Sequence, residues 1–95
     1  MSIVLIRHKV ANYAKWKRAV KACADWRKKS GEKCFRVFRS ASSPNDLTVI
    51  CSFASGAKMQ AFVKSAELRK RMKDAGVISK PVIQFFGASE EMTVS

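Results

Sequence analysis

Residues 32–54, EKCFRVFRSASSPNDLTVICSFA, decide the fold, because they contain two strand-like segments joined by a short turn. In CFRVF and in LTVICSF, successive side chains alternate between two sets, which is the pattern of a β-strand. The connecting SSPND run contains proline, asparagine and aspartate, which favour turns. The stretch therefore predicts an antiparallel hairpin. On the first strand, Phe35 and Val37 would share one face and Cys34, Arg36 and Phe38 the other; on the second, Leu47, Val49, Cys51 and Phe53 would alternate with Thr48, Ile50 and Ser52.

The segment before the hairpin predicts a strand followed by a helix. Residues 2–10, SIVLIRHKV, alternate so that Val4, Ile6, His8 and Val10 would share one face. Asn12 is a good N-cap, and Gly31 is a good C-terminal cap for the helix that lies between them. The apolar face of this helix would carry Trp16, Ala19, Val20, Cys23 and Trp26, with Tyr13 at its margin.

The segment after the hairpin repeats the order of helix and strand. Residues 55–76 predict a second helix with a break or a new cap at Ser65 and an end at Gly76. Residues 77–88, VISKPVIQFFGA, predict a fourth strand, with Pro81 placing it at a sheet edge or near the strand's first residues. The apolar face of the second helix would carry Phe62, Leu68 and Met72, with Ala61 and Ala75.

The resulting β-α-β-β-α-β order predicts an α+β, ferredoxin-like fold, with a four-stranded antiparallel sheet and two helices on one face. Residues 1–88 would form a single domain, and residues 89–95 a polar tail. The sheet face without helices would still carry Ile3, Leu5 and Ile50, with Phe38 or Phe35 depending on the register. An apolar patch on an open sheet indicates a partner, and the simplest one is a second copy packed sheet against sheet.

Composition limits the classes of partner. Nineteen Lys and Arg against seven Asp and Glu give a net charge of +12, which attracts anions of every kind and steers them without requiring a specific site. The three cysteines, Cys23, Cys34 and Cys51, have no C-x-x-C spacing, so we expect a reducing, cytoplasmic location. The opening apolar run is too short for a signal sequence, and no segment is long enough to span a membrane.

Three runs resemble a known superfamily: PNDLTVICSF at 44–53, AFVKSAELRKRMKDAGV at 61–77 and PVIQFF at 81–86. With the chain length and the element order, they are similar to the dimeric α+β barrel superfamily, and within it to small proteins related to the antibiotic biosynthesis monooxygenases. The resemblance implies a homodimer joined through its sheet faces and a small cavity between each sheet and its helices. It extends over nearly the whole chain.

The same resemblance implies positions for a site. Active members include cofactor-free oxygenases of phenolic polyketides and haem-degrading enzymes, which often carry a tryptophan at the end of the third strand and a histidine in the following helix. The nearest positions here are Phe53 and Phe62, which lack both polar functions, and Phe62 cannot ligate iron. Haem chemistry is therefore not implied, and we expect no cofactor.

His8 is the candidate catalytic residue, because an imidazole with a pKa near 6.5 suits a general base at a pocket rim. The alternative is a partly buried histidine that hydrogen-bonds a backbone group. Around His8 we expect a pocket walled by aromatic side chains, and a strand arginine that points into it would bind a carboxylate or phenolate. The candidate ligand-binding residues are Tyr13, Trp16, Arg36, Phe53 and Phe62.

Three functions remain open from the sequence. The first is a monooxygenase-like protein that binds, and without a cofactor transforms, a small aromatic or acidic molecule. The second is a basic RNA-binding module, which needs aromatic residues on its central strands; residues 2–10 have none. The third is a structural dimer module without a ligand. The sequence has no glycine-rich phosphate loop and no metal-ligand spacing, and the basic cluster at 69–73 is typical of a solvated helix face.

Overall fold

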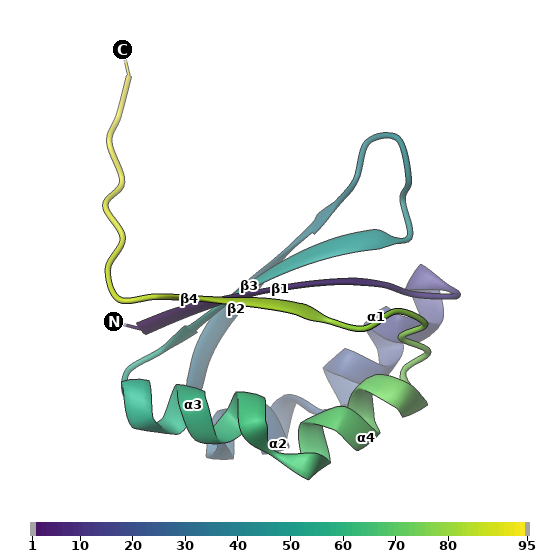
Figure 1. Cartoon of the computed structure of the whole chain (residues 1–95), viewed down its shortest axis with the longest axis horizontal. Helices are drawn as coiled ribbons and strands as arrows, with labels where there is room; N and C mark the ends of the chain where they lie inside the picture. The colour runs from purple at the N-terminus through teal and green to yellow at the C-terminus, as the bar shows by residue number, and fades with distance from the viewer. Residues whose placement is uncertain (1, 95) are drawn as a thin grey trace.

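The computed structural model describes residues 2–94 and confirms the α+β, ferredoxin-like fold (Figure 1). The chain order is β-α-α-β-β-α-α-β, because each predicted helix is divided into two. The four strands form one antiparallel sheet in the order β2-β3-β1-β4, and the helices lie together on one face of it. The elements are β1 (Ser2–Lys9), α1 (Tyr13–Ala22), α2 (Ala24–Lys29), β2 (Glu32–Arg39), β3 (Asp46–Phe53), α3 (Gly56–Lys64), α4 (Ala66–Asp74) and β4 (Val82–Phe86).

The helix ends follow from local capping chemistry. The Asn12 side chain accepts a hydrogen bond from the Lys15 amide at 2.9 Å, as expected of an N-cap. At the predicted break, the extended Ser65 accepts from the Leu68 amide at 3.1 Å and so starts α4. Gly31 has a φ of 98°, a conformation that favours glycine, and it follows the last helical turn. A second break, at Cys23, was not predicted from the sequence.

The core lies between the sheet and the helices. Alternation on β1 and β3 turns one set of side chains inward, and the register pairs Val4 with Cys51 on the two central strands. One prediction for α3 was wrong: Ala61 is exposed, because α3 turns Met59, Phe62 and Val63 toward the sheet at i, i+3 and i+4 spacing. The buried apolar residues are Val4, Ile6, Val10, Trp16, Leu47, Val49, Cys51, Phe53, Met59, Phe62, Val63, Leu68 and Ala75.

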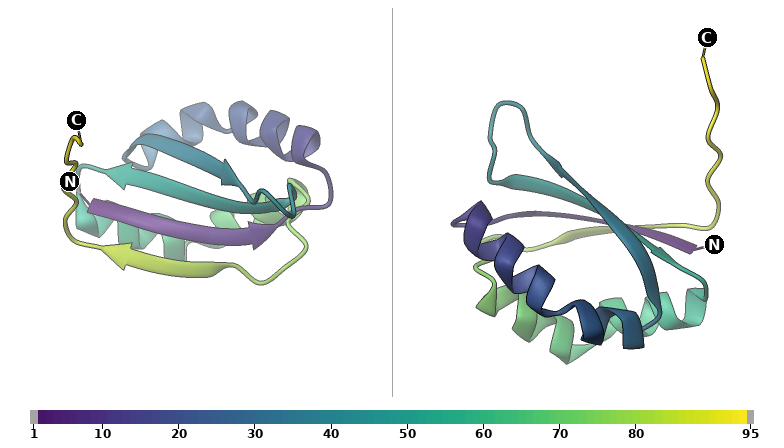
Figure 2. Two further views of the ribbon diagram at one scale, coloured as in Figure 1. Left: turned by 90° about the horizontal axis from the view of Figure 1, so that it is seen from above. Right: turned by 180° about the vertical axis from the view of Figure 1, so that it is seen from behind.

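The last strand is shorter than predicted. β4 begins directly after Pro81, pairs only with β1 and therefore forms a sheet edge, as the proline indicated. Residues 87–94 form no helix or strand and extend on the side of the sheet away from the helices (Figures 1 and 2). Within residues 2–94, none of the helices combines the length and the apolar character needed to cross a membrane.

The sheet face opposite the helices is uncovered. Arg36 pairs with Ile50 and Leu5 with Ile50 across the strands, so these side chains share this face. The register also settles which phenylalanine joins them: Phe38 lies here and is 44% exposed, whereas Phe35 packs against the core. We call the surface formed by Ile3, Leu5, Phe38, Ile50 and Phe86 the open face.

Candidate functional site

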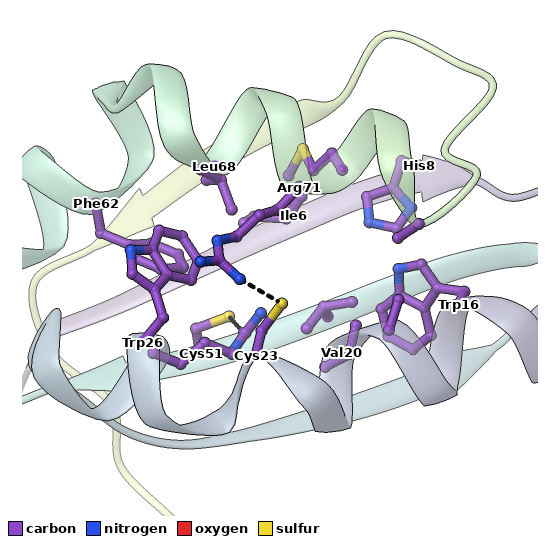
Figure 3. A pocket seen from close by; sticks show the side chains of 15 residues that line it. Ile6, His8, Trp16, Val20, Cys23, Trp26, Cys51, Phe62, Leu68 and Arg71 are labelled. Carbon is purple, nitrogen blue, oxygen red and sulfur yellow. Dashed lines mark hydrogen bonds between the residues drawn. The ribbon is translucent and has the colours of Figure 1, made fainter.

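A cavity of about 50 Å³ lies between the sheet and the two helix pairs, α1–α2 and α3–α4 (Figure 3). Most of its wall is apolar or aromatic. It is large enough for a few water molecules, so a bound aromatic ring requires side chains at its mouth to move. The polar side chains in its wall are His8, Cys23, Arg27, Cys51 and Arg71.

His8 lies at one end of the cavity, where the alternation of β1 turns it inward. The residue is 5% exposed, and its Nδ1 atom is buried without a hydrogen-bond partner among residues 2–94. Burial lowers the pKa of His8, against smaller opposite effects of its own backbone and of the negative charge of Asp46. The imidazole is therefore neutral near pH 7, with a ring nitrogen that no protein group satisfies.

Trp16 closes the cavity beside His8. The two rings meet edge to face, with their centroids 6.0 Å apart, and Trp16 is 5% exposed. Tyr13, which was predicted to bind ligand, instead stacks behind Trp16 at 5.9 Å and does not line the cavity. The Arg39 guanidinium lies 3.9 Å from the centre of the Tyr13 ring. Tyr13 therefore supports the cavity wall from outside.

Aromatic side chains form the other end of the cavity. The rings of Trp26 and Phe62 are 5.1 Å apart, and both line the cavity. Phe53 is fully buried with its ring 5.2 Å from that of Phe62, so it lies one layer behind the wall that it was predicted to form. The structure thus brings His8, Trp16 and Phe62 around one cavity.

Arg36 is far from this arrangement. Its strand position places it on the open face, opposite the cavity, and its guanidinium lies 5.1 Å from the ring centre of Phe38. A role for Arg36 in ligand binding stays a prediction, and it would concern the open face and not the cavity.

Arg71 lies across the cavity mouth, although the sequence grouped it with a solvated basic cluster (Figure 3). Its Nη1 donates to Cys23 Sγ at 3.0 Å, which links α4 to the junction of α1 and α2. The same guanidinium is 4.5 Å from the Trp26 ring centre and forms an ion pair with Glu67 at 2.8 Å. The spacing of Leu68, Met72 and Ala75 could have indicated that position 71 borders the buried face.

A buried ion pair adjoins the inner wall, and sequence reasoning missed it. A β-bulge between Glu32 and Cys34 turns the Glu32 carboxylate inward. Arg27 donates to both carboxylate oxygens, from Nε at 2.6 Å and from Nη2 at 2.8 Å. Its Nη2 also lies 3.7 Å from Cys51 Sγ. Burial, reinforced by the negative charge of Glu32, raises the pKa of the Cys51 thiol, which therefore stays protonated.

The residues of this cavity do not fit a haem. The chain's only histidine is His8 on β1, Phe62 occupies the helix position, and the cavity volume is far below that of a porphyrin. Among residues 2–94, no group of three or more His, Cys, Asp or Glu side chains is arranged to hold a metal ion. The cavity wall instead combines a neutral imidazole, two tryptophan rings and two guanidinium groups.

Comparison with known proteins gives structural matches. No protein-family model and no curated protein sequence matches the chain. SnoaB, a cofactor-independent oxygenase from Streptomyces nogalater, matches with a TM-score of 0.74 and 12% identity over 96% of this chain and 95% of that one. The monooxygenase from the gene ActVA-Orf6 of Streptomyces coelicolor, in complex with nanaomycin D, matches with a TM-score of 0.69 and 16% identity over 99% and 92%.

A candidate antibiotic biosynthesis monooxygenase from Caulobacter crescentus matches with a TM-score of 0.71 and 19% identity over 94% of this chain and 90% of that one. Identities this low show the fold alone. The chain therefore has the fold of the antibiotic biosynthesis monooxygenase-like proteins, as the resemblance in its sequence implied.

Proposed function

We propose that the protein binds a small planar aromatic molecule with an acidic group, such as a phenol, in the cavity between sheet and helices. The observation that carries this proposal is the buried Nδ1 of His8, which has no partner among the described residues and belongs to a ring that lines an aromatic cavity. Leaving a buried polar atom unsatisfied costs about 1–3 kcal/mol, which a ligand hydroxyl would recover.

The chemistry follows from the state of the imidazole. Because burial lowers the pKa of His8, the ring is neutral near pH 7 and can accept a hydrogen bond from a phenol, but the same shift makes it a weaker base, so proton transfer depends on stabilisation of the phenolate beside the imidazolium. The phenolate that forms would be stabilised by the resulting imidazolium. Removing this proton raises the electron density of the aromatic ring, which is what oxygenation without a cofactor requires. The role of His8 is therefore that of a general base.

Ligand entry requires the mouth to open. The contact between Arg71 and Cys23 joins the two helix pairs, and Met72 beside it is a flexible side chain. An arriving acidic group competes for the Arg71 guanidinium and weakens its contact with Cys23. Arg71 would therefore control the entry of the ligand into the cavity.

The assembly in this proposal is a homodimer joined through the open face. Ile3, Leu5 and Ile50 are only partly buried on this surface, and Phe38 is 44% exposed. Packing a second sheet about 10 Å away would cover them and add the buried area that a chain of this size needs. The cytoplasmic location expected from the cysteines stays a prediction.

Specific RNA binding is less well supported. On the open face, the central strands β1 and β3 present Ile3, Leu5, Arg7, Thr48, Ile50 and Ser52, and none of these is aromatic. Base stacking by a four-stranded sheet uses aromatic residues at such positions. The net charge of +12 instead favours weak, nonspecific attraction to nucleic acid.

Tryptophan fluorescence tests the proposed function directly, because Trp16 and Trp26 both line the cavity. Titration with phenol and with 4-hydroxybenzoate should quench this fluorescence to saturation in the wild-type protein. His8→Gln should weaken binding of both compounds, because the glutamine cannot act as a base. Thr48→Ser on the opposite face is the control and should bind as the wild type does. Saturable binding that is identical in His8→Gln would remove His8 from the proposal.

A further inference from the structure

The ion pair between Arg27 and Glu32 is buried, and Arg27 lines the cavity. Their side chains are 12% and 4% exposed, and the contact is bidentate. Taking two charges out of water costs free energy that their attraction offsets only partly, so a buried pair is weak evidence for a stabilising role. Arg27 lines both the cavity and a neighbouring groove, whereas Glu32 lines only the groove.

The guanidinium of Arg27 has one occupied side and one free side. Glu32 engages Nε and Nη2, whereas no acceptor among residues 2–94 bonds to Nη1. The guanidinium stacks on Phe35, with its Cζ 4.3 Å from that ring centre, and reaches the cavity wall, where its Cζ is 5.6 Å from the ring centre of Phe62 and its Nη2 is 3.7 Å from Cys51 Sγ. An anion inside the cavity could therefore accept from Arg27 without displacing Glu32.

Positive charge accumulates behind Arg27. A groove of about 570 Å³ runs along the outer side of β2, and Arg27 and Val20 line both this groove and the cavity. The groove also carries Lys21, Lys28 and Lys33, which raise the electrostatic potential at this end of the molecule. His8 lies at the opposite end of the cavity, beside Trp16 (Figure 3).

We propose that Arg27 binds the carboxylate of the ligand, which makes hydroxylated aromatic acids the ligand class, with the hydroxyl at His8 and the carboxylate at Arg27. This inference rests on the proposed function and adds a second polar anchor to it. Glu32 orients the guanidinium, and its negative charge also offsets part of the attraction for the ligand. Glu32 therefore limits the affinity for carboxylates.

The test is the substitution Glu32→Gln, which keeps the shape and one of the two hydrogen-bond acceptors but removes the competing charge. Calorimetry at pH 7 compares 4-hydroxybenzoate with phenol, which differ only in the carboxylate. Glu32→Gln should bind 4-hydroxybenzoate at least about tenfold more tightly than the wild type and should leave phenol unchanged. Asp25→Asn is the matched control, because it removes one exposed carboxylate from the same region and should change neither affinity.

A second variant covers the case in which the buried charge of Arg27, left without its partner in Glu32→Gln, disturbs folding. Arg27→Gln/Glu32→Gln replaces both charges with amides and should lack the gain in affinity for 4-hydroxybenzoate that Glu32→Gln shows. An increase for 4-hydroxybenzoate that is equal in Glu32→Gln and Asp25→Asn, or no increase, overturns the role of Arg27 while phenol binding upholds the proposed function. If neither compound binds the wild type or Glu32→Gln, the proposed function fails and the inference fails with it.

Discussion

The two faces of the sheet are built from the same strands but differ in how far their side chains are buried. On β1, Val4, Ile6 and His8 point toward the helices and are buried, whereas Ile3 and Leu5 on the other face are only partly covered. The helix side closes over its apolar residues, and within residues 2–94 it leaves one fully buried polar atom, His8 Nδ1, without a partner. The open face leaves apolar side chains such as Phe38 partly exposed.

This difference separates two kinds of recognition. A closed, aromatic cavity with an unsatisfied imidazole nitrogen suits a small ligand. A broad, partly exposed apolar sheet is typical of a surface that binds another protein. In a symmetric dimer, a second copy would cover it with the same residues. The two faces should therefore respond differently to substitution.

Removing a core aromatic residue should have the largest effect on the free energy of unfolding. Phe53→Ala takes away a fully buried ring behind the cavity wall and should lower the free energy of unfolding by about 3–5 kcal/mol. Phe85→Ala removes a ring that is 41% exposed at the sheet edge, and we expect a loss of about 1 kcal/mol or less. Urea unfolding at one protein concentration compares the two. Equal losses would contradict the assignment of Phe53 to the core.

A charge on the open face should break the dimer. Ile3→Asp would bury an unpaired carboxylate in the proposed interface, because its cross-strand neighbours are Ser52 and Phe86, at a cost of about 3 kcal/mol, which corresponds to a dimer dissociation constant roughly a hundredfold higher. Ala61→Asp puts the same charge on the exposed side of α3 and should leave the dimer intact. Sedimentation equilibrium measures both. A monomeric wild type would refute the interface outright.

Lowering the pH should reduce the free energy of unfolding through His8, which is buried on the helix side of the sheet. Burial lowers its folded pKa below the unfolded value of 6.5, so between those two values unfolding takes up a proton. Stability is therefore highest above pH 6.5 and falls as the pH drops from 6.5 toward the folded pKa. His8→Gln should lack this part of the decline. Urea midpoints measured from pH 7.5 down to pH 5 test it, and parallel curves for the two proteins would be evidence against a buried, neutral His8.

Substitutions on the open face should have the smallest effect, which is on nucleic-acid binding. We expect weak binding of a duplex oligonucleotide that falls steeply between about 50 and about 200 mM salt, because it depends on phosphate contacts. Arg69→Gln/Lys70→Gln on the exposed side of α4 should weaken it slightly, and Phe38→Ala should not change it. Fluorescence anisotropy measures the oligonucleotide affinity of each variant. A strong loss in Phe38→Ala would restore a sheet-stacking RNA-binding module as the better interpretation.

Alternation and capping predicted most of the fold. The inward set on β1, the cap at Asn12, the break at Ser65 and the edge position of β4 all follow from local rules that the structure confirms. The break at Cys23 escaped prediction, because the helical spacing of Val20, Cys23 and Trp26 continues across it.

The cavity was predicted only in part. His8, Trp16 and Phe62 meet as their faces indicated, since strand and helix periodicity orient them. The ion pair of Arg27 and Glu32 depends on a β-bulge, which changes the direction of one side chain and leaves no mark in the alternation. The position of Arg71 depends on how the two helix pairs approach each other, which a single sequence does not encode locally.

Measuring the pKa of His8 by NMR, with and without saturating 4-hydroxybenzoate, tests the central claim most directly. In the free protein the pKa should lie below 6.5, because burial disfavours the charged ring. The bound ligand should raise it, because a phenolate beside the ring stabilises the imidazolium. A pKa and ring chemical shifts that stay the same at saturation would show that His8 is a core residue and that the cavity is not the binding site.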